Sequence, residues 1–125
     1  MANDPKTGTK LEDLITILDA QVLCSQNLLS VKVKSVSASD MMSDTLTFAK
    51  EDSLMVTGLN NRQVVRTAEI AGIVAICFVR GKMPQKETIM LAKEKNITLL
   101  TTKLLMFETC GRLYKKGLRG GDEAK

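Results

Sequence analysis

A run of seven apolar residues, from Ile73 to Val79, constrains the fold more than any other feature of this sequence. It is rich in β-branched residues and has no polar residue in alternate positions, so it predicts a central strand that is covered on both faces. The run is too short to cross a bilayer, which needs roughly 18 apolar residues. A strand of this kind requires helices above and below its sheet.

The spacing of apolar residues predicts such helices both before and after the run in the sequence. The five predicted helices begin near Thr9, after the segment Ser37 to Asp40, at Arg62, at Pro84 and after Thr102. Thr9 and Glu12 have the spacing of a capping box, and Pro84 suits a first helical position. The predicted buried stripe of the last helix is Met106, Phe107, Cys110, Leu113 and Tyr114.

Four further segments predict short strands, namely residues 22–24, 31–34, 54–56 and 97–100. In residues 31–34 valine alternates with lysine, which is typical of a strand near the edge of a sheet. Strands separated by helices pair in parallel through right-handed crossovers. We therefore expect an α/β fold, a three-layer α/β/α sandwich with a mostly parallel sheet of about five strands and room for an antiparallel strand at its edge. This domain would span residues 10–118, between tails at residues 1–9 and 119–125.

The composition excludes several kinds of chemistry. The chain has no histidine, which removes serine or cysteine triads, histidine metal sites and the usual proton shuttle near neutral pH. The three cysteines lack the spacing of a zinc site or a disulfide framework and favour a reducing, cytoplasmic location. With no tryptophan, one tyrosine and three phenylalanines, nucleic acid is not an expected partner. No apolar leader or long apolar segment indicates a membrane.

Polar residues and glycines follow each predicted strand, where ligands bind in open parallel sheets. The candidate ligand-binding residues are Ser37, Ser39, Asp40, Thr57, Gly58, Asn60, Asn61, Arg62, Arg80, Gly81, Thr101 and Thr102. Amides at helix starts and guanidinium groups bind phosphate or carboxylate oxygens, and one charge-assisted hydrogen bond contributes roughly 1.5–3 kcal/mol. We expect these residues to surround one shared hollow. They would equally cap helices and close turns without any ligand, and this interpretation stays open.

A catalytic set is not evident in the sequence. Asp40 is the one carboxylate of this rim, so paired-acid and two-metal hydrolysis have little support. Gly81-Lys82 is followed by Met83 and has no glycine five residues before it, which excludes a P-loop. We predict no catalytic residue, no metal and no cofactor. A small enzyme in which Asp40 is the base and Arg62 or Arg80 holds an anionic substrate is the less favoured alternative.

Four stretches of the sequence resemble the DRTGG domain, and most of all its small stand-alone members in anaerobic bacteria and archaea. They are residues 35–46 (SVSASDMMSDTL), 54–65 (LMVTGLNNRQVV), 71–84 and 97–117. Asn61-Arg62 stands where the family has Asp-Arg, and Val79-Arg80-Gly81 where it has Thr-Gly-Gly. Ser39-Asp40 and Ser43-Asp44 match the serine-aspartate motif of the small members, while Lys34-Ser35 replaces a common glycine pair.

The resemblance implies an accessory domain that is not itself catalytic. Such domains occur beside phosphotransacetylase domains, between CBS domains of some pyrophosphatases and, as a related fold, at the amino end of HPr kinase. It implies a regulatory or oligomerisation module, a homodimer that senses a nucleotide or another small anion in anaerobic energy or redox metabolism. The alternative is a docking or assembly protein for a larger redox enzyme or kinase, without a ligand of its own, which the seven methionines would suit.

Overall fold

Five strands form the central sheet of the computed structural model, which describes residues 8–25 and 30–121. Their order is β2 (Gln21–Cys24), β7 (Thr98–Thr101), β6 (Ala75–Phe78), β5 (Ser53–Thr57) and β4 (Ser35–Ala38). β4 to β7 are mutually parallel, and β2 runs antiparallel to β7 at one edge. The apolar run from Ile73 to Val79 thus contains the middle strand, as predicted.

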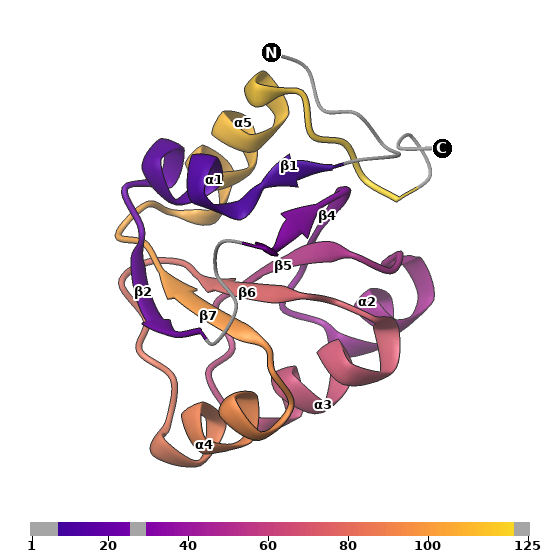
Figure 1. Cartoon of the computed structure of the whole chain (residues 1–125), viewed down its shortest axis with the longest axis vertical. Coiled ribbons are helices and arrows are strands. Elements are labelled where there is room, and N and C mark those ends of the chain that lie inside the picture. The colour runs from indigo at the N-terminus through magenta and orange to yellow at the C-terminus, as the bar shows by residue number, and fades with distance from the viewer. Residues whose placement is uncertain (1–7, 26–29, 122–125) are drawn as a thin grey trace.

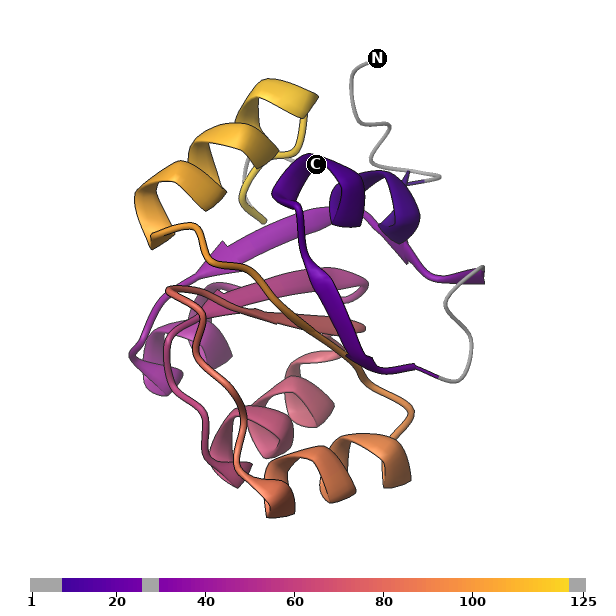
Figure 2. The same cartoon turned by 90° about the vertical axis from the view of Figure 1, so that its left-hand side faces the viewer.

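Helices cover both faces of this sheet (Figures 1 and 2). α1 (Leu11–Leu18) and α5 (Met106–Lys116) lie on one face. α2 (Met42–Phe48), α3 (Arg62–Ala71) and α4 (Lys86–Glu94) lie on the other. The predicted three-layer α/β/α sandwich with a mostly parallel sheet of five strands is confirmed. No helix in the described part of the chain is long and apolar enough to cross a membrane.

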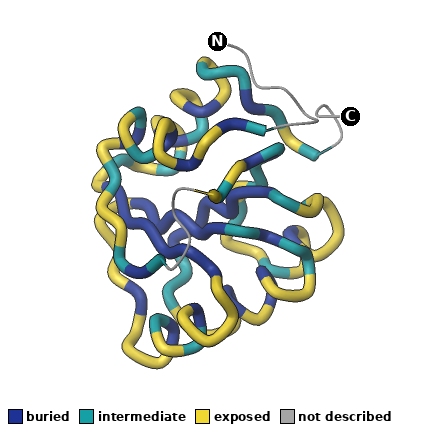
Figure 3. Tube along the Cα trace, in the orientation of Figure 1, coloured by how far each residue is buried: buried dark blue, intermediate teal, exposed yellow. Residues whose placement is uncertain are grey.

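Alternate residues of the middle strands enter two separate hydrophobic cores. In β6, Ala75 and Cys77 belong to the core beneath α1 and α5, while Ile76 and Phe78 belong to the core above α3 and α4. All four are completely buried, and Figure 3 shows the buried colour along the middle of the sheet. The period of two in β-strands makes this division, and because both faces are buried no polar residue interrupts the run.

The segment before α1 differs from the prediction. Thr9 belongs to β1 (Thr9–Lys10), which pairs antiparallel with β3 (Lys32–Val33) in a separate two-stranded sheet. The capping box is therefore wrong: Lys10 is the N-cap residue of α1, and its side chain makes no capping hydrogen bond. The strand predicted at residues 31–34 is present as Lys32–Val33 and has a single neighbouring strand, but it belongs to this small sheet and not to the main one.

Three other helix starts were placed too early. Ser37 and Ala38 are part of the edge strand β4, so α2 begins only after Met41. Gln85 is the N-cap residue of α4, which leaves Pro84 outside the helix, and Leu105 is the N-cap residue of α5. In each case a polar or proline residue that suits a helix start instead ends a strand or a loop.

The buried face of α5 agrees with the prediction only in part, because Leu113 is buried and Met106 packs against the core. Thr109 and Leu113 are buried, whereas 85% of Phe107 and 56% of Tyr114 are exposed. The helix is thus rotated relative to the predicted stripe. Beyond Gly117, Leu118 is buried and the carbonyl of Arg119 accepts a hydrogen bond from the Val36 N–H (3.0 Å). The chain therefore continues to pack on β4 where a frayed end was expected. Residues 1–7 and 122–125 of the predicted tails lie outside the described residues.

Candidate functional site

The carboxyl ends of β4, β5, β6 and β7 lie along one edge of the sheet because these strands are parallel. Asp40 follows β4 and reaches the end of β5. Its Oδ1 accepts hydrogen bonds from the Thr57 hydroxyl (3.0 Å) and from the Gly58 N–H (2.7 Å). Two donors from the neighbouring strand therefore fix this carboxylate in position.

Arg80 follows β6 with a left-handed backbone, at a φ of 60°. This conformation costs a residue with a side chain roughly 1–2 kcal/mol. It is held by the chain after β7: the Arg80 N–H donates to the Leu104 carbonyl and the Gly81 N–H to the Thr102 carbonyl, both at 2.8 Å. Gly81 is left-handed as well, at a φ of 66°. The turn thereby directs the Arg80 side chain back toward β5.

The guanidinium group of Arg80 lies against Gly58. A Cβ atom at Gly58 would come within 2.8 Å of Arg80 Cζ and Nη1, so a side chain at this position would displace the guanidinium from its present place. Nη1 is also 4.0 Å from Asp40 Oδ2, and the two side chains are 43% and 46% exposed. An ion pair this open contributes about 0–1 kcal/mol. We call Asp40, Thr57, Gly58 and Arg80 the Asp40 cluster.

The Asp40 cluster leaves hydrogen-bond donors available. A guanidinium carries five N–H groups in a planar fork. Within residues 8–25 and 30–121, no acceptor is hydrogen-bonded to the Arg80 side chain. Such a fork, oriented by a carboxylate and facing solvent, can bind the oxygens of a phosphate or a carboxylate.

Four of the other candidate residues have structural partners. The Thr101 hydroxyl donates to the Lys82 carbonyl (2.8 Å), and the Thr102 hydroxyl donates to the Leu18 carbonyl (2.7 Å). The Asn60 side chain donates to the Met83 carbonyl (3.0 Å), and Asn61 caps α3 by accepting from the Gln63 N–H (3.0 Å). The contacts of these four residues agree with the alternative interpretation, in which such residues cap helices and close turns without any ligand.

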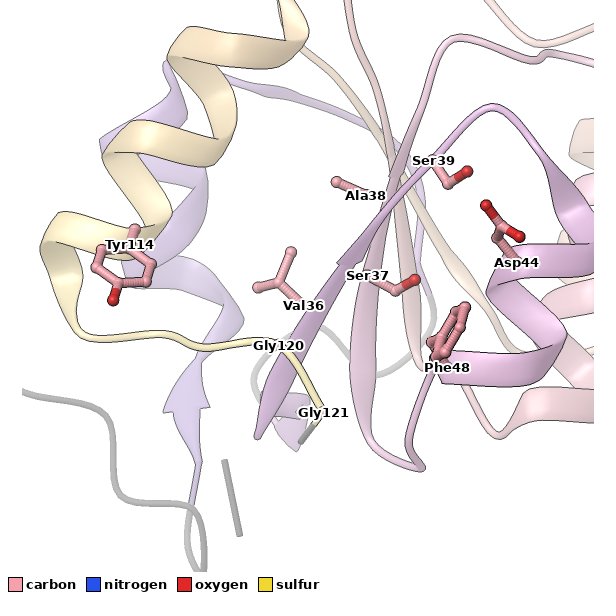
Figure 4. Close-up of a pocket in the computed structure, with 9 residues that line it drawn as sticks. All are labelled: Val36, Ser37, Ala38, Ser39, Asp44, Phe48, Tyr114, Gly120 and Gly121. Atoms are coloured by element: carbon pink, nitrogen blue, oxygen red, sulfur yellow. The ribbon is translucent and has the colours of Figure 1, made fainter. Parts of the chain in front are cut away.

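The shared hollow stays a prediction: candidate residues outside the Asp40 cluster line three different cavities at this end of the sheet and beside α3. Gly81, Thr101 and Thr102 line one of about 340 Å³ together with Asp19 and Lys103. Arg62 lines one of about 490 Å³ between α3 and α4. Ser37 and Ser39 line one of about 470 Å³ along β4 (Figure 4).

The sequence did not indicate several residues that surround these cavities. Asp19 and Lys103 border the first, and Phe48 and Tyr114 border the one along β4. Asp19 ends α1 in a left-handed conformation, so it follows no predicted parallel strand. Tyr114 was assigned to the core by its helical spacing. One feature of the sequence could have located the strand beside the cavity along β4. Val36 and Ala38 alternate with serines, which is typical of a strand.

The cysteines are protected by the fold. Burial raises the pKa of all three thiols, that of Cys77 from 9.0 to about 12. The nucleophilic thiolate is therefore scarce at neutral pH. In the part of the chain that the structure describes, no group of three or more cysteine, aspartate or glutamate residues could hold a metal ion.

Comparisons with known proteins agree with this architecture. The fold defines a small layered α/β domain whose parallel strands end at one polar edge. The family model of the DRTGG domain matches residues 13–115, and the chain belongs to this family. No curated protein matches it.

One of the solved structures that match contains the CBS and DRTGG domains of the regulatory region of Clostridium perfringens pyrophosphatase, complexed with an activator, diadenosine tetraphosphate. The sequences are 22% identical, with a TM-score of 0.67. The match covers 93% of this chain and 50% of that chain, so the present chain spans about half its length. This likeness supports the fold.

Replacing Gly58 with alanine tests the contact with Arg80. We expect Gly58→Ala to lower the free energy of unfolding by at most about 1 kcal/mol, because the new methyl group displaces only the flexible end of the half-exposed Arg80 side chain and its open ion pair with Asp40. In an Arg80→Ala background the same change should cost less than about 0.5 kcal/mol. Urea unfolding of the four proteins gives the coupling energy, and equal costs in both backgrounds would contradict the contact.

The raised pKa of Cys77 predicts a stability that depends on pH. The folded state holds the thiol proton more tightly than the unfolded state, so this stabilisation is complete below pH 9 and is lost as the pH rises toward 12. Between pH 9 and 10.5 the wild type should lose about 2 kcal/mol more than Cys77→Ala. Urea unfolding of both proteins measures the difference, and parallel pH profiles would refute it.

Proposed function

We propose that this protein is a non-catalytic regulatory module that binds a phosphate-bearing small molecule, of the nucleotide class, at the Asp40 cluster. The observation that carries the proposal is the Arg80 guanidinium: a strained turn, Gly58 and Asp40 hold it in place, and its donors face solvent. Strained backbone is retained where the surrounding structure determines it, often at ligand sites.

Neighbouring groups extend this site beyond one contact. Gly81, next to Arg80, lines the cavity of about 340 Å³, and the exposed Lys103 lies at the same cavity. A volume of this size lies at the lower end of the ~300–1,000 Å³ range of small-molecule sites. We infer that phosphate oxygens bind Arg80 and Lys103, and that the cavity accepts an adjoining part of the ligand. Asp40 acts as a positioning residue for Arg80.

An enzymatic role has less support. The Oδ1 of Asp40, the one carboxylate of the cluster, already accepts two hydrogen bonds, and burial keeps the cysteine thiols protonated. The pyrophosphatase regulatory region, which contains CBS and DRTGG domains, is complexed with a nucleotide activator, and this supports a regulatory role for the present chain. A homodimer, a cytoplasmic location and a role in anaerobic metabolism complete the proposal.

The docking alternative is favoured by a separate observation. Met41, Met83 and Met90 each expose more than half of their surface. Flexible methionine side chains on a surface suit adaptable protein contacts. A docking protein without a ligand of its own would use these residues and leave the Asp40 cluster without a binding role.

Arg80→Met separates the two functions. We expect inorganic phosphate, ATP or diadenosine tetraphosphate to raise the melting temperature of the wild type; a ligand at 100 times its Kd adds about 2.7 kcal/mol. Arg80→Met should weaken binding by roughly ten- to hundredfold, because one charge-assisted bond contributes 1.5–3 kcal/mol. Arg66→Met, an exposed arginine of α3, is the control and should bind normally. No shift with any of these ligands, or equal losses in both variants, would contradict the proposal.

A further inference from the structure

One edge of the sheet, that of β4, is open. The Ser39 N–H donates to the Val56 carbonyl of β5 (3.0 Å), whereas the Val36 N–H donates to Arg119 on the opposite side (3.0 Å). Backbone groups of alternate strand residues point to opposite sides, so Ala38 faces outward as Val36 does. Within residues 8–25 and 30–121, no hydrogen-bond partner is found for the Ala38 N–H.

This edge lacks the features that usually prevent strands from pairing. Edge strands are commonly protected by charged side chains, prolines or bulges. The sequence of β4 is Ser-Val-Ser-Ala, with none of these, and of the described residues after α5, up to residue 121, Arg119 is hydrogen-bonded to the Val36 end of this strand. At the other edge, β2 has an irregular register between Val22 and Cys24, as a bulge gives.

Aromatic side chains stand on both sides of the open edge. Figure 4 shows Val36 and Ala38 pointing toward α5 with Tyr114, and Ser37 and Ser39 toward α2 with Phe48. Phe48 is 61% exposed, Tyr114 56% and Phe107 85%. Phe107 precedes Tyr114 by seven residues, two helical turns, so both lie on the same face of α5.

We propose that a second copy of this chain pairs with this edge, Ala38 against Ala38, about a two-fold axis. Antiparallel pairing at this position forms two N–H···O=C bonds between the Ala38 residues and leaves the Val36–Arg119 bond in place. The proposal locates the homodimer of the proposed function and rests on that part of it, independently of the Asp40 cluster.

The apolar area favours a second copy over a single extended peptide. An aromatic side chain buries about 150–250 Å² when fully covered. Phe48 and Tyr114 line the cavity along β4, and in the proposed dimer two copies together contribute six aromatic side chains that are each more than half exposed. They supply roughly 500–1,000 Å², most of the ~1,200 Å² that a stable interface requires. A peptide would cover only three of them.

The test is the mass of the full chain in solution across concentrations of 5–500 µM, by light scattering and sedimentation. We expect twice the chain mass of 13.7 kDa for the wild type. Ala38→Pro removes the outward N–H, a change that an open edge tolerates. Phe48→Lys places one positive charge from each copy in the interface. It replaces Ala38→Pro in the experiment if the proline variant does not fold. Each should raise the dimer dissociation constant at least tenfold.

Ile70→Lys is the matched control, because Ile70 is 74% exposed on α3 and outside the proposed interface. It should remain a dimer. A wild type that stays monomeric at every concentration would overturn the proposal, and so would a dimer that both variants retain or that Ile70→Lys disrupts equally. Phosphate and nucleotide binding should persist in the monomeric variants, so a failure of this interface is distinguishable from a failure of the Arg80 site.

Discussion

Burial of the middle strands on both faces is the constraint on which the rest of the structure depends. β5, β6 and β7 place alternate side chains in two cores, so helices must close both faces of the sheet. Each crossover then returns the chain in parallel, and the carboxyl ends of four strands collect at one edge. The Asp40 cluster exists because this topology brings residue 40 beside residues 57, 58 and 80.

The Asp40 cluster combines a fixed anion with a cation that retains free donors. Two hydrogen bonds fix the Asp40 carboxylate. A left-handed turn orients the Arg80 side chain, and the guanidinium packs against Gly58. Compared with the family pattern that the sequence suggested, Arg80 adds a charged side chain to a loop expected to contain glycine. The chain thus belongs to the DRTGG family and carries at this loop a feature of its own.

The layers, the middle strand and all four residues of the Asp40 cluster were among the sequence predictions, because burial on both faces and the order of strands determine the pattern of apolar residues. Thr9, Ser37 and Thr101 lie in strands, although the sequence suggested that they precede helices. Hydroxyl side chains suit a helix cap, the end of a strand and a loop equally well, so the residue type does not distinguish them. The sequence also predicted that Phe107 and Tyr114 are buried. Helical spacing identifies an apolar face of a helix, but it does not show what covers that face. The shared hollow stays a prediction, because the spacing of residues along the chain does not reveal which cavity each side chain lines.

Backbone amide chemical shifts during a titration with ATP test the central claim most directly. We expect the largest shifts on Gly58, on the turn at Arg80 and Gly81, and on the segment at Lys103. These segments are distant in sequence and meet only at the proposed phosphate site. Shifts concentrated on Arg62 and Arg66, or no shifts at millimolar ATP, would contradict it.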